Sequence, residues 1–194
     1  GMLVQWRLQS VFTKYSHVRT SNGMTGRDVA EKMLRDNGIY DVRVTSTPGH
    51  LTDHYNPADK TVNLSESVYN SPSIAAAAVA SHECGHAVQH ARGYAWLEMR
   101  SKLVPLISIT SRFSTWVIII GLLTINTFPA LFWVGILMIA ASALFSIITL
   151  PVEYNASARA LDWLRSTRTL DATQMEGASI SLRWAARTYL VAAL

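Results

Sequence analysis

Two long apolar stretches dominate the second half of the chain. The first covers residues 103–126 and the second residues 129–150, and no Asp, Glu, Lys or Arg lies between Arg112 and Glu153. Each stretch is near the ~20 residues that an α-helix needs to cross a bilayer. The pattern therefore predicts a transmembrane helical hairpin over residues 103–150. A very apolar, buried pair of helices in a soluble protein is the alternative.

Basic residues flank the predicted hairpin on both sides. They are Arg100, Lys102 and Arg112 at its start, and Arg159, Arg165 and Arg168 after its end. Short segments rich in Lys and Arg stay on the cytoplasmic side of a membrane. We therefore expect both open ends of the hairpin to face the cytoplasm.

The first third of the chain follows shorter patterns. Residues 1–16 place apolar side chains at helical spacing, which predicts a helix stub too short to span a bilayer. A second short helix is expected over residues 25–37, with Thr25 as its N-cap and Gly38 at its end.

Residues 40–64 have the character of strands instead. Val42 and Val44 alternate with polar residues, and the turn-forming segment NPADK at residues 56–60 separates two short runs. Alternation of this kind, interrupted by Pro, Asn and Asp, predicts two or three short strands in a small antiparallel sheet.

A longer helix is expected over residues 72–92. Ser71 can cap it, Pro72 suits its first position and Gly93 can end it. Residues 151–194 return to helical spacing, with Asp171 and Gln174 resembling the capping box of a last helix that reaches Leu194. The sequence thus predicts a mainly α fold with a small antiparallel sheet, in a single domain over residues 1–194.

Composition excludes two classes of protein. Cys84 is the only cysteine, which excludes an internal disulfide framework and a cysteine-based zinc finger, and we expect it to be a small buried residue. Lys and Arg outnumber Asp and Glu by 17 to 13. These basic residues are scattered and no RNA-binding or recognition-helix pattern accompanies them, so we expect no nucleic acid partner.

The segment SHECGH carries the most specific chemical pattern. His82 and His86 are four residues apart, which places both imidazoles on one face of the predicted helix, and Glu83 follows the first of them. This HExxH spacing is typical of zinc peptidases, in which the Glu acts as general base. It predicts a zincin-like catalytic unit over residues 17–100, joined to the transmembrane hairpin.

A catalytic zinc ion needs a third protein ligand. Glu153 is the candidate, since it is the only acid between Glu98 and Asp162 and an isolated carboxylate beside a bilayer needs a partner. It could instead form an ion pair with Arg159 or Arg100. His90 is an alternative third ligand, although three successive helical turns spread their donors widely.

These segments together resemble the YugP-like family of bacterial membrane neutral zinc metallopeptidases. The likeness covers nearly the whole chain and is carried by KYSHVRTSNGMTGRDVAEKML, GHLTDHYNPADKTVNLSESVY, SHECGH and PVEYNASARAL. It implies a gluzincin-type peptidase with Zn²⁺ held at His82, His86 and Glu153 and with Glu83 as catalytic acid/base. It also implies further apolar segments before and after this chain, in a multi-pass protein of the bacterial cell membrane with its catalytic side cytoplasmic.

Asn155, like Asn56, stands where that family usually has Asp. Zinc-binding histidines normally donate their second ring N–H to an outer partner. Asn155 or Ser157, both near Glu153 in the sequence, could accept such a bond. Because Asn155 is uncharged, we expect a lower zinc affinity than with Asp at this position.

The segment GHLTDHY holds further candidates. One of His50, Asp53, His54 and Tyr55 could stabilise the oxyanion that forms when water attacks a peptide carbonyl. A strand here could also pair with an extended substrate. The alternative is that the segment only closes the small sheet.

The sequence as a whole predicts a zinc-dependent endopeptidase at the cytoplasmic membrane surface, in which Glu83 activates a zinc-bound water. Its expected partners are the lipid bilayer and a peptide or membrane-protein substrate. One alternative is a non-catalytic membrane protein with a structural zinc site. Another is a soluble peptidase with a very apolar core.

Overall fold

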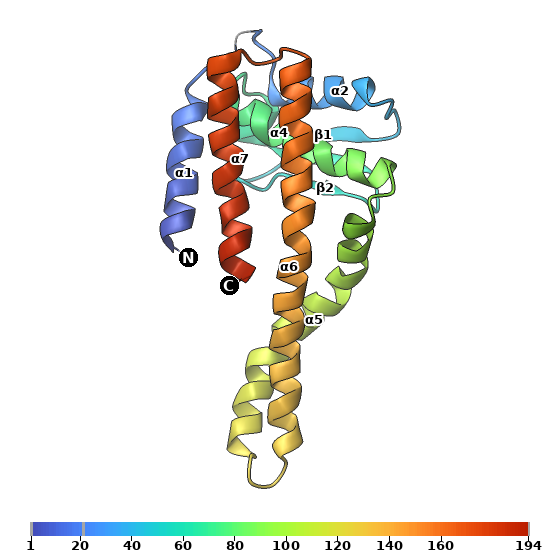
Figure 1. Ribbon diagram of the computed structural model, residues 1–194, viewed down its shortest axis with the longest axis vertical. Helices are drawn as coiled ribbons and strands as arrows, with labels where there is room; N and C mark the ends of the chain where they lie inside the picture. The colour runs from blue at the N-terminus through green and yellow to red at the C-terminus, as the bar shows by residue number, and fades with distance from the viewer. Residues whose placement is uncertain (1, 21, 194) are drawn as a thin grey trace.

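The chain folds into a helical head from which a long helical hairpin projects (Figure 1). The computed structural model describes residues 2–20 and 22–193, so the predicted helix end at Leu194 lies outside it. The head contains the helices α1 (Met2–Ser16), α2 (Gly26–Asp36), α3 (Glu66–Tyr69), α4 (Ile74–Ala91) and α7 (Ala172–Ala193). It also holds the strands β1 (Arg43–Thr47), β2 (His54–Asn56) and β3 (Thr61–Ser65). The mainly helical fold with a small sheet is confirmed.

The hairpin consists of α5 (Ala95–Leu123) and α6 (Pro129–Ser166), and both helices extend into the head. They are longer than residues 103–150 because α5 begins before Arg100 and α6 continues through Pro151. A proline removes one backbone donor but does not end a helix that neighbouring helices support. α6 therefore belongs to the hairpin and to the head at once (Figure 1).

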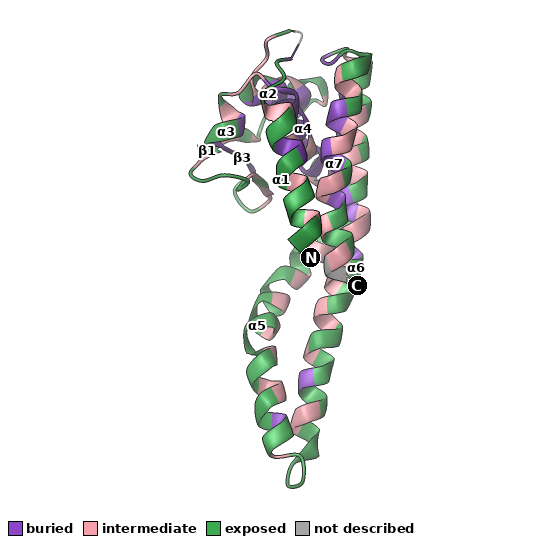
Figure 2. Cartoon of the chain, turned by 90° about the vertical axis from the view of Figure 1, so that its left-hand side faces the viewer, coloured by how far each residue is buried: buried purple, intermediate pink, exposed green. Residues whose placement is uncertain are grey.

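Most large apolar side chains of the hairpin are exposed (Figure 2), and both helices are long and apolar enough to cross a membrane. This exposure argues against a buried helical pair in a soluble protein. Two glycines lie where the helices touch: an added Cβ would be 2.6 Å from Phe132 Cα at Gly121 and 2.5 Å from Ile118 Cγ1 at Gly135. Small residues at such points let membrane helices pack closely.

Helix α4 lies at the centre of the head, where it packs against α1, α2, α6 and α7. The prediction that it begins at Pro72 is wrong by two residues. Ser73 is the N-cap, its Oγ accepting from the Ala76 backbone N–H at 3.1 Å. Pro72 stays extended because its carbonyl accepts from the Thr20 N–H at 2.8 Å and Ser73 pairs with Arg19.

The sheet is mixed rather than wholly antiparallel, in the order β1-β3-β2. β2 and β3 form the predicted antiparallel hairpin around residues 57–60, but β1 pairs with β3 in parallel. Alternating side chains identify a strand without fixing the direction of its partner. β2 is left as an edge strand among the described residues, beside α4.

Two predicted helix caps are present. Thr25 and Asp28 form a reciprocal capping box at the start of α2. Asp171 and Gln174 do the same at α7, where Asp171 Oδ1 accepts from the Gln174 N–H at 2.8 Å. Each cap satisfies backbone donors that have no partner within the helix.

Candidate metal centre

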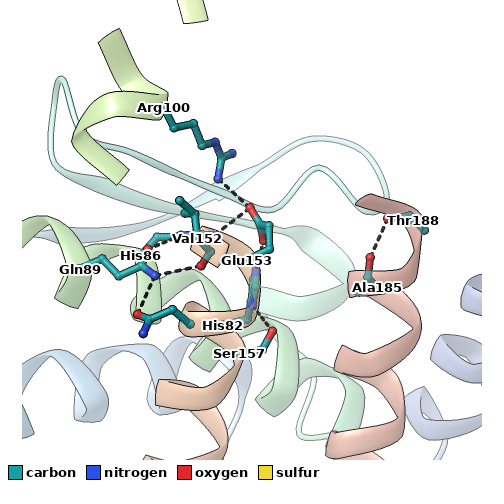
Figure 3. A network of polar contacts seen from close by, with 10 residues as sticks. His82, His86, Gln89, Arg100, Val152, Glu153, Ser157, Ala185 and Thr188 are labelled. Carbon is teal, nitrogen blue, oxygen red and sulfur yellow. Dashed lines mark hydrogen bonds and ion pairs between the residues drawn. The ribbon is translucent and has the colours of Figure 1, made fainter. Parts of the chain in front are cut away.

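Helices α4 and α6 bring His82, His86 and Glu153 together, although more than sixty residues separate Glu153 from the histidines. Their ligand atoms all lie within 4.8 Å of one another. Glu153 Oε2 lies 2.9 Å from His82 Nε2, and its Oε1 lies 3.4 Å from His86 Nε2. Figure 3 shows the carboxylate between the two imidazoles and Arg100. The predicted spatial convergence is therefore present, while the role of these residues as ligands stays a prediction.

The outer ring nitrogens of both histidines have their own partners. His82 Nδ1 lies 3.0 Å from Ser157 Oγ, and His86 Nδ1 lies 2.9 Å from Gln89 Oε1. Gln89 Nε2 donates to the Val152 carbonyl at 2.9 Å, which fixes the amide so that its oxygen accepts from His86. In this arrangement His86 carries its proton on Nδ1, and Nε2 keeps a free lone pair toward Glu153.

Gln89 was not predicted as a site residue. Its side chain is fully buried, and besides Val152 it donates to Asn155 Oδ1 at 3.0 Å. The available signal was its position three residues after His86, on the same helix face. Of the two residues expected to accept a bond from a histidine, Ser157 lies 3.0 Å from His82 Nδ1, whereas Asn155 Oδ1 accepts from Gln89 and from Arg159 Nε at 2.7 Å. Asn155 thus contacts His86 only through Gln89.

Arg100 of α5 forms an ion pair with Glu153. Its guanidinium donates to Glu153 Oε1 at 2.7 Å, and the Glu153 side chain is only 2% exposed. The sequence indicated this pairing as an alternative to metal binding. The structure shows the ion pair at Oε1, while Oε2 lies beside His82, so the ion pair does not prevent Glu153 from also serving as a metal ligand. A buried carboxylate is stabilised by such partners.

A pocket of about 410 Å³ opens beside the cluster. His86, Glu153 and the candidate base Glu83 line it. The edge strand β2 and the turn after it line another part, and the remaining lining comes from α5 and α7, through Leu97, Arg100, Ser101, Val104, Pro105 and Tyr189. The cluster is therefore reachable from a cavity whose wall includes the first helix of the hairpin.

Glu83 borders this pocket next to the histidines. Burial raises the pKa of its carboxyl to about 8, with a further rise from the Glu153 carboxylate and an opposing effect of His82. Without a metal the group therefore holds its proton at neutral pH. A dication held by the cluster would favour the carboxylate, because opposite charge lowers the pKa of an acid.

Only some of the other candidate residues line the pocket. His54 and Tyr55 line the pocket, but His54 Nδ1 lies 2.8 Å from the Thr52 carbonyl and the Tyr55 hydroxyl 2.7 Å from His90 Nδ1. His90 thus contacts Tyr55 and is not part of the three-residue cluster. His50 lies against Phe12 and Ser67, and it is not among the residues that line this pocket.

Cys84 points away from the metal cluster. Its side chain is fully buried, and its Sγ lies 3.5 Å from the Ala30 carbonyl of α2. The prediction of a small buried residue is confirmed. Burial also raises the pKa of the Cys84 thiol, so that it stays protonated.

The donor set fits a zinc ion. Two neutral imidazoles and one carboxylate are the protein ligands typical of a catalytic zinc site, which keeps a fourth position open. Here the Nδ1 atoms of His82 and His86 have Ser157 and Gln89 as hydrogen-bond partners, and their Nε2 atoms face the Glu153 carboxylate. The pocket borders His86 and Glu153, so a fourth position can be open to it.

Comparison with known proteins agrees with this chemistry. The model of a family described as "Putative neutral zinc metallopeptidase" matches residues 1–194. A curated relative from Bacillus subtilis (strain 168), described as "Putative membrane protease YugP", is 42% identical over 192 residues, covering 98% of this chain and 84% of the relative. No solved structure matches the chain at a significant level.

Proposed function

The chain belongs to the neutral zinc metallopeptidase family, and from this premise we propose that it is an endopeptidase hydrolysing peptide bonds at the cytoplasmic membrane surface. The observation that carries the proposal is the convergence of His82, His86 and Glu153 beside a pocket that Glu83 also lines. A purely structural metal site needs neither an adjacent acid nor an open pocket.

His82, His86 and Glu153 would hold the zinc ion. When bound there, zinc supplies Lewis-acid chemistry, polarising the peptide carbonyl and making water more acidic. Ser157 and Gln89 hold the two imidazole rings in orientation through their Nδ1 atoms. Arg100 holds the carboxylate of Glu153 from the side of the pocket.

Glu83 is the proposed general base. Its carboxylate removes a proton from a water molecule while the water oxygen forms a bond to the carbonyl carbon of the substrate. The C–N bond then breaks, and Glu83 delivers the same proton to the leaving amine nitrogen. No net charge or electron is gained by the enzyme in this cycle.

The position of the pocket supports a membrane-proximal substrate. Leu97, Val104 and Pro105 of α5 line it, and the same helix continues into the apolar hairpin. The basic residues around the hairpin favour a multi-pass arrangement with the head in the cytoplasm. We therefore propose that the substrates are peptides or segments of membrane proteins close to the bilayer surface.

Replacing the base tests the proposal. The protein would be purified in detergent, loaded with zinc and assayed on fluorogenic peptides, in the wild-type form and as Glu83→Gln. We expect Glu83→Gln to bind one equivalent of zinc and to lose about 10²- to 10⁴-fold in kcat. Glu98→Gln, at an exposed acid of α5, is the matched control and should remain fully active.

Two outcomes would contradict the proposal in different ways. Unchanged activity in Glu83→Gln would remove this residue from the mechanism. A wild-type chain that holds zinc but cleaves none of the peptides, nor a membrane protein reconstituted with it, would instead favour a structural zinc. Removal of zinc by a chelator should abolish activity, and adding zinc back should restore it.

A further inference from the structure

Tyr189 of α7 lines the same pocket as part of the segment in which the sequence indicated an oxyanion stabiliser. It lines the pocket together with Glu83, His86 and Glu153. Its side chain belongs to the last helix, more than thirty residues after Glu153 and more than a hundred after Glu83. The fold alone therefore brings this side chain to the pocket beside the candidate metal centre.

Three other donors around the pocket already have hydrogen-bond partners. The Tyr55 hydroxyl lies 2.7 Å from His90 Nδ1, and Arg100 donates to Glu153 at 2.7 Å. His54 Nδ1 lies 2.8 Å from the Thr52 carbonyl. The Tyr189 hydroxyl makes no hydrogen bond to any residue in the described part of the chain, so its O–H is free for a ligand in the pocket.

The surroundings of Tyr189 keep it protonated. Burial raises the pKa of its phenol, and the carboxylates of Glu153 and Glu83 raise it further. The phenol consequently remains a hydrogen-bond donor throughout the neutral and mildly alkaline range.

We propose that Tyr189 is a catalytic residue that donates a hydrogen bond to the carbonyl oxygen of the scissile peptide as that oxygen becomes negative. The inference rests on the proposed peptidase function. Glu83 and Tyr189 then have separate roles. Glu83 accepts the proton of the attacking water, and Tyr189 stabilises the negative charge that the attack creates on the carbonyl oxygen. A donor that meets the oxyanion more strongly than the neutral carbonyl lowers the barrier without tightening substrate binding.

The test is Tyr189→Phe, which removes the hydroxyl and keeps the ring. We expect kcat to fall about 10²- to 10³-fold, the usual cost of one lost oxyanion donor, with KM nearly unchanged. Bound zinc and the melting temperature should equal those of the wild type. Tyr40→Phe, at an exposed tyrosine outside the pocket, is the matched control and should leave all four quantities unchanged.

A second readout does not depend on turnover. A phosphonamidate peptide, whose tetrahedral anionic group imitates the attacked carbonyl, should bind Tyr189→Phe more weakly by about the same factor as the fall in kcat/KM. Binding of the corresponding peptide substrate would be measured in proteins that carry Glu83→Gln, so that it is not cleaved. The Glu83→Gln protein and the Glu83→Gln, Tyr189→Phe double variant should bind this substrate with equal affinity.

The outcomes separate this inference from the proposed function. An active wild type with an equally active Tyr189→Phe overturns the inference alone. A fall in activity matched by an equal loss of zinc assigns Tyr189 a structural role and also overturns it. A zinc-loaded wild type without peptidase activity overturns the proposed function, and the catalytic role of Tyr189 with it.

Discussion

Gly85 lies directly against the backbone of Ala156. A Cβ added at Gly85 would lie 2.6 Å from the Ala156 carbonyl oxygen, which is closer than real Cβ atoms approach any neighbour. The contact joins α4 and α6 at the level of the metal cluster, because Gly85 lies between His82 and His86 while Ala156 follows Glu153 by one helical turn. The distance between the helices at this point therefore sets the distance between the histidines and the carboxylate.

Gly85→Ala should weaken zinc binding by separating the two helices. In an ordinary helix this substitution would stabilise the protein by about 1 kcal/mol. Here the added methyl group meets backbone rather than a movable side chain, so overpacking should cost about 1 to 3 kcal/mol instead. We expect a lower melting temperature and at least a tenfold weaker zinc affinity, measured by competition with a chromophoric chelator.

Cys84→Ala provides the control for this prediction. Cys84 is the preceding residue of the same helix and is equally buried, but it packs toward Ala30 of α2 rather than toward α6. Its replacement should change stability slightly and leave zinc affinity as in the wild type. Equal zinc affinity in Gly85→Ala and Cys84→Ala would show that the helix spacing does not govern the site.

The parts of the fold that were predictable depend on residues close together in the sequence. The capping boxes at Thr25 and Asp171, the two apolar helices and the HExxH spacing all lie within short windows. Each follows from helix geometry or from bilayer thickness. The start of α4 was misplaced because Ser73 pairs with Arg19, a contact between distant segments that no local pattern contains.

Gln89 and Tyr189 could not be predicted from the sequence, because their contacts also join segments that are far apart in it. Gln89 gains its role from the Val152 carbonyl on another helix, and Tyr189 reaches the pocket only when α7 packs beside α4 and α6. Glu153 was accessible to sequence reasoning because it is an isolated acid at the end of an apolar stretch. The parallel pairing of β1 likewise depends on residues 48–53, which lead from β1 to β2 on the other side of β3.

Gln89→Leu should lower zinc affinity more than Ser157→Ala. Gln89 is fully buried and holds His86, so its loss leaves the buried Nδ1–H of His86 without a partner. Ser157 is partly exposed, and water can take its place at His82 Nδ1. We expect a loss of about 10- to 100-fold for Gln89→Leu and a smaller one for Ser157→Ala.

Isothermal titration of the zinc-free variants would measure this order. Gln89→Glu is informative as a third variant, because a carboxylate accepts from His86 but cannot donate to Val152 or Asn155. It should restore only part of the affinity. Equal affinities in Gln89→Leu and the wild type would mean that His86 needs no outer partner.

Asp53 should make the stability of the zinc-free protein decrease as the pH rises. Burial raises its pKa above the ordinary value of 3.8, while the hydrogen bonds from Ser65 and the charge of His50 oppose the rise. The unfolded chain therefore loses this proton first on going to higher pH. The contribution of the neutral acid is complete below pH 3.8 and is lost as the pH passes the higher pKa of the folded state.

Asp53→Asn removes this titration and can still accept a bond from the Ser65 N–H. Chemical unfolding of both forms in detergent, from pH 3.5 upward, should show the variant gaining stability relative to the wild type as the pH rises. Asp162→Asn, at an exposed acid, should run parallel to the wild type. A constant difference between Asp53→Asn and the wild type would show that Asp53 titrates alike in both states.

Arg100→Met should destabilise the zinc-free protein more than the zinc-loaded one. Glu153 is 2% exposed, and in the zinc-free chain its negative charge is paired with the guanidinium of Arg100. Breaking a fully buried ion pair costs about 3–5 kcal/mol, and because the Arg100 side chain is 26% exposed, water should reduce the loss to about 2 kcal/mol. A dication would itself balance the negative charge of the carboxylate, so zinc should remove most of the difference in stability.

Melting curves with chelator and with excess zinc would measure the destabilisation by Arg100→Met in each state. Lys102→Met, at an exposed residue of the same helix, is the control and should shift neither curve. Equal shifts under both conditions would mean that Arg100 supports the helix α5 rather than the charge of Glu153.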